Sequence, residues 1–375
     1  MQTPTVSFVV PCYNLAHFLP ECINSILSQT YANFEVLIMD DFSPDNTQEV
    51  AASFQNPRVR YIRNDPNLGH LRNYNKGITL SRGKYVWLIS ADDYLRKPYI
   101  LEKYVDLLDK HPNIGYVFCQ GLGVRDGIET RVLGAGVGGK CDRIMRGHNF
   151  LKKLLHSNVV LTPSAMVRRE CYEKVSLFPE NMPWAGDWFL WCLFALYYDV
   201  GYFTDRMLCY REHHEMSMTH ILSQERLEAC AAEEISIPWF IRKKALEAGF
   251  TKVAKECLAA VADTYGRIMA SERYVKSGCF MNFDQFEDSI RKHITSESNM
   301  NWVRARVYAS VANELYWRGE LSSAKKYYQE ALKKDSLMPS VHIKRLLLSL
   351  GKQGDYIRKT ILSSRLPEND LKSAN

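Results

Sequence analysis

The sequence predicts an α/β protein with a mostly parallel central sheet, followed by a separate domain made only of helices. Two observations lead to this fold class. Short apolar strands alternate with amphipathic helices over the first ninety residues, and from about Leu222 onwards the pattern is helical with few strand signals. The chain has 375 residues, which is enough for two domains, and we place them at residues 1–221 and 222–375.

The N-terminal domain begins with strands and helices in alternation. Four runs rich in β-branched and aromatic residues predict strands at 6–10, 34–39, 59–62 and 85–89. The stretches between them predict helices at 17–29 and 71–80, the first with its apolar residues on one stripe and the second ended by Gly83. A further helix at 98–111 and a strand at 114–120 follow. Such alternation is typical of a parallel sheet with right-handed crossovers.

Composition and charge describe an ordinary globular protein. A content of 46% hydrophobic and 24% charged residues excludes a disordered chain, a collagenous chain and a small disulfide scaffold. The net charge of +6 permits contact with an anionic membrane or a phosphorylated substrate and does not indicate a nucleic-acid partner. We find no apolar run of transmembrane length and no signal peptide, and the ten cysteines form no C-x-x-C pair. We therefore expect buried thiols in a cytoplasmic protein, with the inner face of the membrane as one place of action.

Acidic residues directly follow two of the predicted strands. Asp40 and Asp41 follow the second strand, Asp92 and Asp93 follow the fourth, and the first ends at residues 11–14. Because the carboxyl ends of parallel strands meet at one edge of a sheet, we expect these segments to lie together. Converging carboxylates repel each other unless a cation lies between them, and Mg²⁺ and Mn²⁺ prefer oxygen ligands. The alternative is that each aspartate only caps the helix that follows it.

The chain resembles the family-2 glycosyltransferases, which have the GT-A fold, in four segments of the same order and spacing: VSFVVPCYN, VLIMDDFSPDNT, NDPNLGHLRNYNKGI and YVWLISADD. The resemblance covers roughly residues 4–220 and implies a nucleotide-sugar donor site at the edge of the sheet. In such a site Pro11 and Tyr13 would border the uracil, and Asp41 would accept a hydrogen bond from the base. It implies that the donor-binding residues are Pro11, Tyr13, Asn14, Asp41, Arg72, Ser90, Ala91, Asp92 and Arg211.

The resemblance also implies a metal site at residues 90–92. Ser90, Ala91 and Asp92 occupy the family's Asp-x-Asp position, with Asp92 as the metal ligand, and the first aspartate is replaced by Ser90. A serine can hydrogen-bond a ribose hydroxyl but is a poor metal ligand, so the division of labour between Asp92 and Asp93 stays open. The expected cofactor is Mn²⁺ or Mg²⁺.

A second region, NVVLTPSAMVRRECYEKVSLFPENMPWAGDWFLWCLFAL, is similar to the acceptor side of the same family. We expect Asp187 to be the general base, because a carboxylate within hydrogen-bond reach of a sugar hydroxyl can take its proton. Trp184 and Trp188 flank it, and tryptophans can stack on a sugar face and partly desolvate the carboxylate. The alternative is that Asp187 caps the helix starting at Trp188.

The closing part of the resemblance is a Tyr-Arg-x-His segment at Tyr210, Arg211 and His213. It implies that Arg211 contacts the diphosphate and that His213 completes the metal coordination. The alternative for His213 is a solvated loop histidine. A glycine-rich stretch, GAGVGGKC at 134–141, nearly matches a phosphate loop, but Cys141 stands where that motif needs a hydroxyl, so we interpret it as a flexible loop.

The last third predicts helices at 225–236, 239–248, 251–269, 283–293 and 302–318. Residues 304–334 resemble one tetratricopeptide repeat, which we place near 304–337. One repeat cannot bury its own faces, so it packs on neighbouring helices or on a protein partner. Residues 239–244 and 343–347 mix apolar and basic side chains, which predicts either helix core with solvated lysines or peripheral contact with an anionic membrane.

These observations predict an inverting glycosyltransferase that moves a sugar from a nucleotide-sugar, expected to be a UDP-sugar, to a hydroxyl of a sugar or lipid-linked glycan acceptor in polysaccharide assembly. The alternative is a catalytically weak nucleotide-sugar-binding or scaffold protein that acts through its helical repeat. A nucleotidyltransferase is disfavoured, because residues 11–14 stand where its phosphate-binding glycines and lysine are needed.

Overall fold

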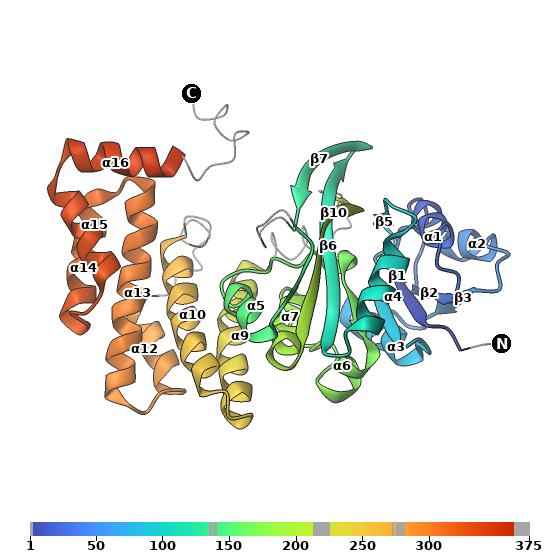
Figure 1. Cartoon of the computed structure of the whole chain (residues 1–375), viewed down its shortest axis with the longest axis horizontal. Coiled ribbons are helices and arrows are strands. Elements are labelled where there is room, and N and C mark those ends of the chain that lie inside the picture. Colours follow the sequence, from blue (N-terminus) through green and yellow to red (C-terminus); the bar gives the residue numbers. More distant parts are fainter. Residues whose placement is uncertain are drawn as a thin grey trace. The chain divides into compact units, whose positions relative to one another are not determined.

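A computed structural model describes residues 3–134, 137, 141–212, 226–271, 274 and 282–363 of the chain (Figure 1). The chain divides into two compact units, Met1–Arg226 and Leu227–Asn375. The boundary at residue 221 that we expected lies outside the described residues, and so do His213 and most of the glycine-rich stretch at 134–141.

The first unit is built on one mixed sheet, which over the described residues has ten strands. Its strands, in chain order, are β1 (Val6–Cys12), β2 (Phe34–Asp40), β3 (Val59–Arg63), β4 (Tyr85–Leu88), β5 (Tyr94–Leu95), β6 (Ile114–Arg125), β7 (Ile128–Leu133), β8 (Arg143–Met145), β9 (Met166–Arg168) and β10 (Asp199–Arg211). The main path across the sheet is β3-β2-β1-β4-β9-β6-β10-β5. The α/β class is therefore confirmed.

The sheet is less parallel than we predicted. β1 pairs in parallel with β2 and β4, as the strand–helix alternation predicts, and β6 pairs in parallel with β10. β9 lies between β4 and β6 and is antiparallel to both, and β5, β7 and β8 also pair antiparallel with their neighbours. The chain enters β9 from the 3-10 turn η2 (Thr162–Ser164) instead of from a crossover helix, which allows the opposite direction.

Helices of the first unit are α1 (Leu19–Leu27), α2 (Thr47–Ala52), α3 (His70–Leu80), α4 (Ile100–Lys110), α5 (Gly147–Leu154), α6 (Arg169–Lys174) and α7 (Gly186–Tyr197). Their positions agree with the apolar stripes of the sequence. Arg168 ends β9, and α6 begins directly after it at Arg169. The cysteine expectation also needs one correction: Cys141 is exposed, whereas the other described cysteines are buried and free.

Aromatic residues in the core of this unit hold η2 in place. Trp87 stacks on Tyr104, with ring centroids 4.8 Å apart. The indole nitrogen of Trp87 donates to the carbonyl of Pro163 at 2.8 Å, and the Tyr104 hydroxyl donates to the carbonyl of Ser164 at 2.9 Å. Both side chains are fully buried. The rigid core therefore fixes the backbone on which Thr162 stands.

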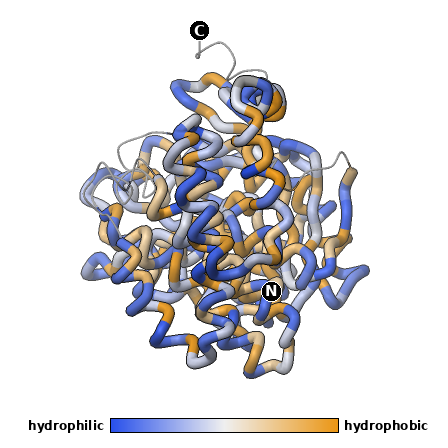
Figure 2. The backbone as a smooth tube through the Cα atoms, turned by 90° about the vertical axis from the view of Figure 1, so that its left-hand side faces the viewer, coloured by the Kyte–Doolittle hydropathy of each residue, from blue (hydrophilic) through white to orange (hydrophobic). Residues whose placement is uncertain are grey.

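The second unit is all helical in its described residues: α9 (Leu227–Glu247), α10 (Thr251–Ala270), α12 (Phe283–Arg291), α13 (Glu297–Arg318), α14 (Leu321–Lys334), α15 (Pro339–Ser349) and α16 (Lys352–Ser363). Figure 2 shows hydrophobic and hydrophilic stretches alternating along these helices. The two helices that we expected at 225–236 and 239–248 are one, because Pro238 is accommodated inside α9. None of the helices that the structure describes is long and apolar enough to cross a membrane.

Helices α13 and α14 form a hairpin of the kind that the resemblance to a tetratricopeptide repeat implies. Gly319, with a φ of 89°, ends α13 in the left-handed conformation that favours glycine. Small buried residues allow close approach of the two helices, and Ala312 and Ala324 are fully buried between them. Tyr328 donates to the side-chain oxygen of Asn313 across the pair at 2.8 Å.

Candidate active site

A cavity of about 620 Å³ opens at the carboxyl ends of β1, β2 and β4. This is the edge at which we expected ligands in such a sheet. Predicted residues of both the donor and the acceptor side line it: Pro11, Tyr13, Asp41, Ser90, Asp92, Asp93, Trp184 and Asp187. Side chains separated by more than 170 residues are thus brought to one cavity, which the resemblance implied and the residues alone could not show.

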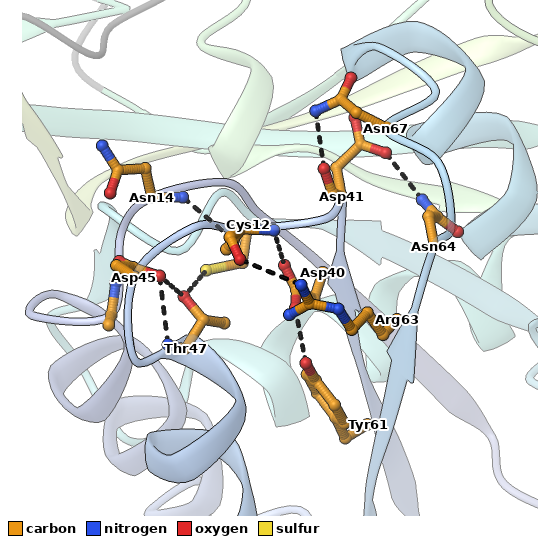
Figure 3. Close-up of polar contacts among 12 residues, drawn as sticks. Cys12, Asn14, Asp40, Asp41, Asp45, Thr47, Tyr61, Arg63, Asn64 and Asn67 are labelled. Atoms are coloured by element: carbon orange, nitrogen blue, oxygen red, sulfur yellow. Dashed lines mark hydrogen bonds and ion pairs between the residues drawn. The ribbon is translucent and has the colours of Figure 1, made fainter.

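The first acidic pair has two different roles. Asp40 is fully buried. It accepts hydrogen bonds from the Tyr61 hydroxyl at 2.5 Å and from Arg63 at 3.0 Å, and the charge of Arg63 balances that of the carboxylate (Figure 3). Burial, and then the hydrogen bond to Asp40, raise the pKa of Tyr61 to about 12. Asp41 lines the cavity. The expectation that both aspartates meet at the ligand therefore holds only for Asp41.

Asp41 anchors the loop that precedes α3. One carboxylate oxygen accepts from the Asn64 side chain and from the backbone nitrogen of Leu68, both at 2.8 Å, and the other accepts from the nitrogen of Gly69 at 2.9 Å. Asn67 donates to the carbonyl of Asp41 at 2.6 Å (Figure 3). These bonds define the loop wall of the cavity and leave a carboxylate lone pair for a ligand.

Asn14 belongs to the loop after β1 but not to the cavity lining. It has a φ of 57°, a left-handed conformation that asparagine tolerates, and its backbone nitrogen donates to the Ser43 hydroxyl at 3.1 Å. Asp45 accepts from the backbone nitrogen of Ala16 at 2.9 Å and from the Thr47 hydroxyl at 2.5 Å (Figure 3). The loop after β1 is thereby tied to the loop after β2, and Tyr13 is held 43% exposed at the cavity.

Asp92 and Asp93 form the acidic centre of the cavity. Asp93 is only 2% exposed and accepts a hydrogen bond from the backbone nitrogen of Arg211 at 3.1 Å. Burial, and then the neighbouring charge of Asp92, raise the pKa of Asp93 well above its usual range. Ala91 is fully buried and its nitrogen donates to the carbonyl of Pro11 at 3.1 Å, which fixes the strand end that carries both carboxylates.

The donor set of this centre suits a hard divalent cation. Two adjacent carboxylates offer oxygen ligands, and a cation between them would offset the burial and the mutual repulsion that raise the pKa of Asp93. Within the described ranges, no group of three or more His, Cys, Asp or Glu side chains is placed to hold a metal by itself. The third predicted ligand, His213, falls outside those ranges.

Asp187 lies in the first turn of α7, and a hydrogen bond connects it to the turn η2 on the acceptor side of the cavity. Its Oδ2 accepts from the Thr162 hydroxyl at 2.5 Å and from the side-chain nitrogen of Asn158 at 3.1 Å. Burial raises the pKa of Asp187, and the hydrogen bonds from Thr162, from the nitrogen of Trp188 and from Asn158 oppose that effect. A carboxylate with a raised pKa that faces a cavity is suited to accept a proton.

The two tryptophans beside Asp187 lie in different surroundings. Trp184 lines the cavity, as we expected for an acceptor-binding residue. Trp188 is 6% exposed, is not among the lining residues, and donates from its indole nitrogen to the carbonyl of Leu154 at 2.6 Å. The helical turn points it into the core beneath α7, so it supports Asp187 from behind and does not reach a sugar.

Neither predicted arginine lines the cavity. Arg72 is exposed on α3 and forms an ion pair with Glu180 at 2.7 Å. Arg211 forms an ion pair with Glu21, and its guanidinium lies over the ring of Phe18 at 4.4 Å. Among the described residues that line the cavity there is no lysine or arginine. The walls therefore carry carboxylates without a matching fixed positive charge.

Several lining residues escaped the sequence analysis. Tyr74 of α3 lines the cavity, and burial, and then the charges of Asp92 and Asp187, raise its pKa. Thr162 and Asn158 reach the cavity beside Asp187. His70 lines the wall as well and donates to the carbonyl of Pro183 at 3.2 Å, while burial lowers its pKa. In the sequence, these lining residues could have been found only from their position inside the segments that resemble the family.

Comparisons with known proteins agree with this geometry. Residues 7–175 match the family described as Glycosyl transferase family 2. The chain is 34% identical over 111 residues to the glycosyltransferase GlyG of Streptococcus pneumoniae, covering 29% of this chain and 37% of that protein. It is 27% identical over 221 residues to an uncharacterized glycosyltransferase of Rickettsia typhi, covering 58% of this chain and 67% of that one. The match thus spans little more than a third of GlyG and about two thirds of the Rickettsia protein.

The fold has a solved counterpart. The crystal structure of S. aureus TarS 1-349 in complex with UDP superimposes with a TM-score of 0.57 and 18% identity, covering 86% of this chain and 87% of that one. A second TarS structure contains UDP-GlcNAc, also with a TM-score of 0.57. At this identity the likeness shows the fold. Residues 7–175 of the N-terminal unit thus match a family-2 glycosyltransferase domain, and the unit has the GT-A fold.

Proposed function

We propose that this chain transfers a sugar from a UDP-sugar to an acceptor hydroxyl with inversion at the anomeric carbon. The observation that carries the proposal is the shared cavity, in which Asp92 and Asp93 lie on one wall and Asp187 on another. The resemblance implies that the first two lie at the donor diphosphate and that the third is the base, and their position in one cavity supports this assignment. UDP as the nucleotide carrier of the sugar is supported by the TarS complexes, which contain UDP and UDP-GlcNAc.

The donor binds at the ends of β1 and β2 in this proposal. Tyr13 offers an exposed aromatic face on which a uracil can stack, and Pro11 borders the same space. Asp41 retains a lone pair for the base while its other bonds hold the loop wall. Ser90 lines the cavity between Asp41 and Asp92, where its hydroxyl suits a ribose.

The charge of the cavity supports the presence of a divalent cation in this proposal. A diphosphate brings negative charge to walls that already carry Asp92, Asp93 and Asp187, and Arg72 and Arg211 are paired elsewhere. Asp92 and Asp93 would hold Mn²⁺ or Mg²⁺, which supplies the positive charge that offsets the diphosphate and the leaving UDP. The cation and its identity are part of the proposal.

Asp187 performs the proton transfer. It takes the proton of the acceptor hydroxyl as that oxygen forms a bond to the anomeric carbon, and the bond from this carbon to the UDP oxygen breaks with its electron pair. Attack from the face opposite to UDP inverts the configuration in one displacement, without a covalent enzyme intermediate. Trp184 lines the acceptor side and can stack on a sugar of a glycan or lipid-linked glycan acceptor.

The test separates donor binding from proton transfer. We expect Asp187→Asn to lose transfer, measured as UDP release from a panel of UDP-sugars with sugar acceptors, while thermal stabilisation by UDP with Mn²⁺ stays as in the wild type. The matched control is Asp126→Asn, an exposed turn residue with a φ of 52° that asparagine also tolerates. Substantial transfer by Asp187→Asn would reject its role, and no nucleotide stabilisation in the wild type would favour a scaffold acting through its helices and a protein partner.

A further inference from the structure

The second unit exposes a stripe of apolar side chains on α15. Ile343 and Leu346 are 60% and 62% exposed, and Leu350 just after the helix is 43% exposed. Their spacing of three and four residues places them on one face of the helix. The opposite face is already used, because Val341 is 2% exposed and Leu348 packs in the core of α13 and α14. This α15 stripe (Ile343, Leu346 and Leu350) therefore does not take part in the packing of the repeat.

Neighbouring segments add further exposed apolar residues. Leu337 in the turn before α15 is 85% exposed, and Tyr356 and Ile357 of α16 are 74% and 39% exposed. Single exposed apolar residues are common on protein surfaces, but six large ones within 21 residues are a concentration that marks an interaction surface.

The same end of the chain carries all of its net charge. Residues 321–375 contain 11 of the 48 basic and 5 of the 42 acidic residues, which gives +6, and the preceding 320 residues contain 37 of each and are neutral. Lys325, Lys326 and Lys334 of α14 and Lys359 of α16 are exposed. Positive charge and apolar surface thus coincide on the last three helices.

The structure also decides between the two mixed stretches found in the sequence. In 239–244, Trp239 is 7% exposed and Ile241 is fully buried, and Phe240 alone of the three apolar residues is exposed, at 39%. In 343–347, Ile343 and Leu346 are 60% and 62% exposed. Of the two candidates for membrane contact, the second therefore presents the more accessible apolar surface.

We propose that the α15 stripe and the surrounding basic residues dock the chain on an anionic membrane surface. Apolar side chains can enter the boundary between headgroups and acyl chains while lysines approach anionic headgroups, and no membrane-spanning helix is needed. A second copy of the chain is the less suitable occupant, because pairing the two surfaces would bring two segments of +6 together. An RNA or DNA backbone would leave the apolar stripe in water.

The experiment uses the full chain and vesicles of phosphatidylcholine alone or with anionic phosphatidylglycerol in a co-sedimentation assay. We expect binding to the anionic vesicles, at least about tenfold weaker binding to neutral ones, and loss of binding at high salt. Replacing Ile343 and Leu346 together by serine should reduce anionic binding by about tenfold. The matched control replaces Ile128 and Ile144, which are 70% and 42% exposed in the first unit, and should bind like the wild type.

Three outcomes would overturn the proposal: equal binding to neutral vesicles, unchanged binding after the Ile343/Leu346 replacement, or a self-association in solution that this replacement abolishes while vesicle binding is absent. Circular dichroism checks that the double variant is folded. UDP release with a soluble acceptor distinguishes this proposal from the proposed function. The stripe variant should keep that activity, and Asp187→Asn should lose it while still binding vesicles.

Discussion

Replacing Thr162 by valine removes the shortest hydrogen bond to the proposed base without changing the shape of the side chain. The Thr162 hydroxyl donates to Asp187 Oδ2 at 2.5 Å, and Asn158 donates to the same oxygen at 3.1 Å. The backbone of Thr162 should stay in place, because Trp87 and Tyr104 hold the next two residues of η2 from the core. The substitution therefore changes the electrostatics of Asp187 more than its position.

The direction of the expected change in the pKa of Asp187 follows from its protonation states. The hydrogen bond from Thr162 favours the charged carboxylate and opposes the rise in the pKa of Asp187 that burial causes. Its loss must raise that pKa further. A hydrogen bond to a charged group contributes about 1.5–3 kcal/mol. Since about 1.36 kcal/mol corresponds to one pH unit, the acid limb of kcat/KM should move up by roughly 1–2 pH units.

The assay is UDP release measured from about pH 5 to 9, with the acceptor concentration varied at each pH. As the pH falls through the pKa of Asp187 the base becomes protonated, so Thr162→Val should lose transfer at a higher pH than the wild type and recover much of it in alkali. Thr162→Ser restores the hydroxyl and should restore the wild-type limb. Thr79→Val, on an exposed threonine whose hydroxyl only meets the carbonyl of Asn75, is the matched control.

A uniform loss of rate at every pH would refute this argument, because it would mean that Thr162 supports the fold of the wall and does not tune the base. A shift of the acid limb to lower pH would contradict the sign. If Asn158 alone held Asp187 in its charged form, Thr162→Val would leave the limb unchanged, and the role would pass to Asn158.

Two further predictions concern a missed lining residue and an ion pair whose carboxylate is buried. Tyr74→Phe should lower kcat/KM about tenfold and leave UDP binding unchanged, because the phenol shares the cavity with Asp92 and Asp187, whose charges add to the effect of burial on its pKa; equal loss of UDP stabilisation would place it in the donor site. Glu35→Gln should lower the free energy of unfolding by about 1–3 kcal/mol at pH 7 in urea denaturation. Burial raises the pKa of Glu35, but hydrogen bonds from Arg82 and Ser7 outweigh it and lower that pKa, so the difference between variant and wild type should shrink as the pH falls below about 4.

Much of the first unit was predictable because its strands are local signals. The runs at β1, β2 and β4 are buried along their whole length, and such runs stand out in a sequence without any knowledge of their neighbours. The direction of β9 was not predictable in this way. It depends on η2, a three-residue turn held by Trp87 and Tyr104 from distant parts of the chain. Pairing that is decided by tertiary contacts leaves no periodic trace.

The acidic pairs show the same limit at the level of single residues. Asp40 is the last residue of β2 and Asp41 follows it directly, yet successive side chains of an extended segment point to opposite faces. Asp40 meets Tyr61 and Arg63, and Asp41 meets the loop at 64–69 and the cavity. Sequence position predicted that an aspartate would reach the ligand edge, but the choice between the two depended on partners more than twenty residues away.

The residues that surround the proposed base explain why the sequence pointed to a candidate base but not to its environment. Asp187 was a candidate because the family resemblance implies a base in this segment, and the flanking tryptophans fit that role. Tyr74, Thr162 and Asn158 have no such implied role: a tyrosine in an amphipathic helix is most often core, and threonine and asparagine are common in turns. They acquire a role only because α3, η2 and α7 converge on one cavity. The electrostatics of the base are therefore a property of the tertiary structure, and a variant such as Thr162→Val, which leaves the sequence motifs intact, tests that structure directly.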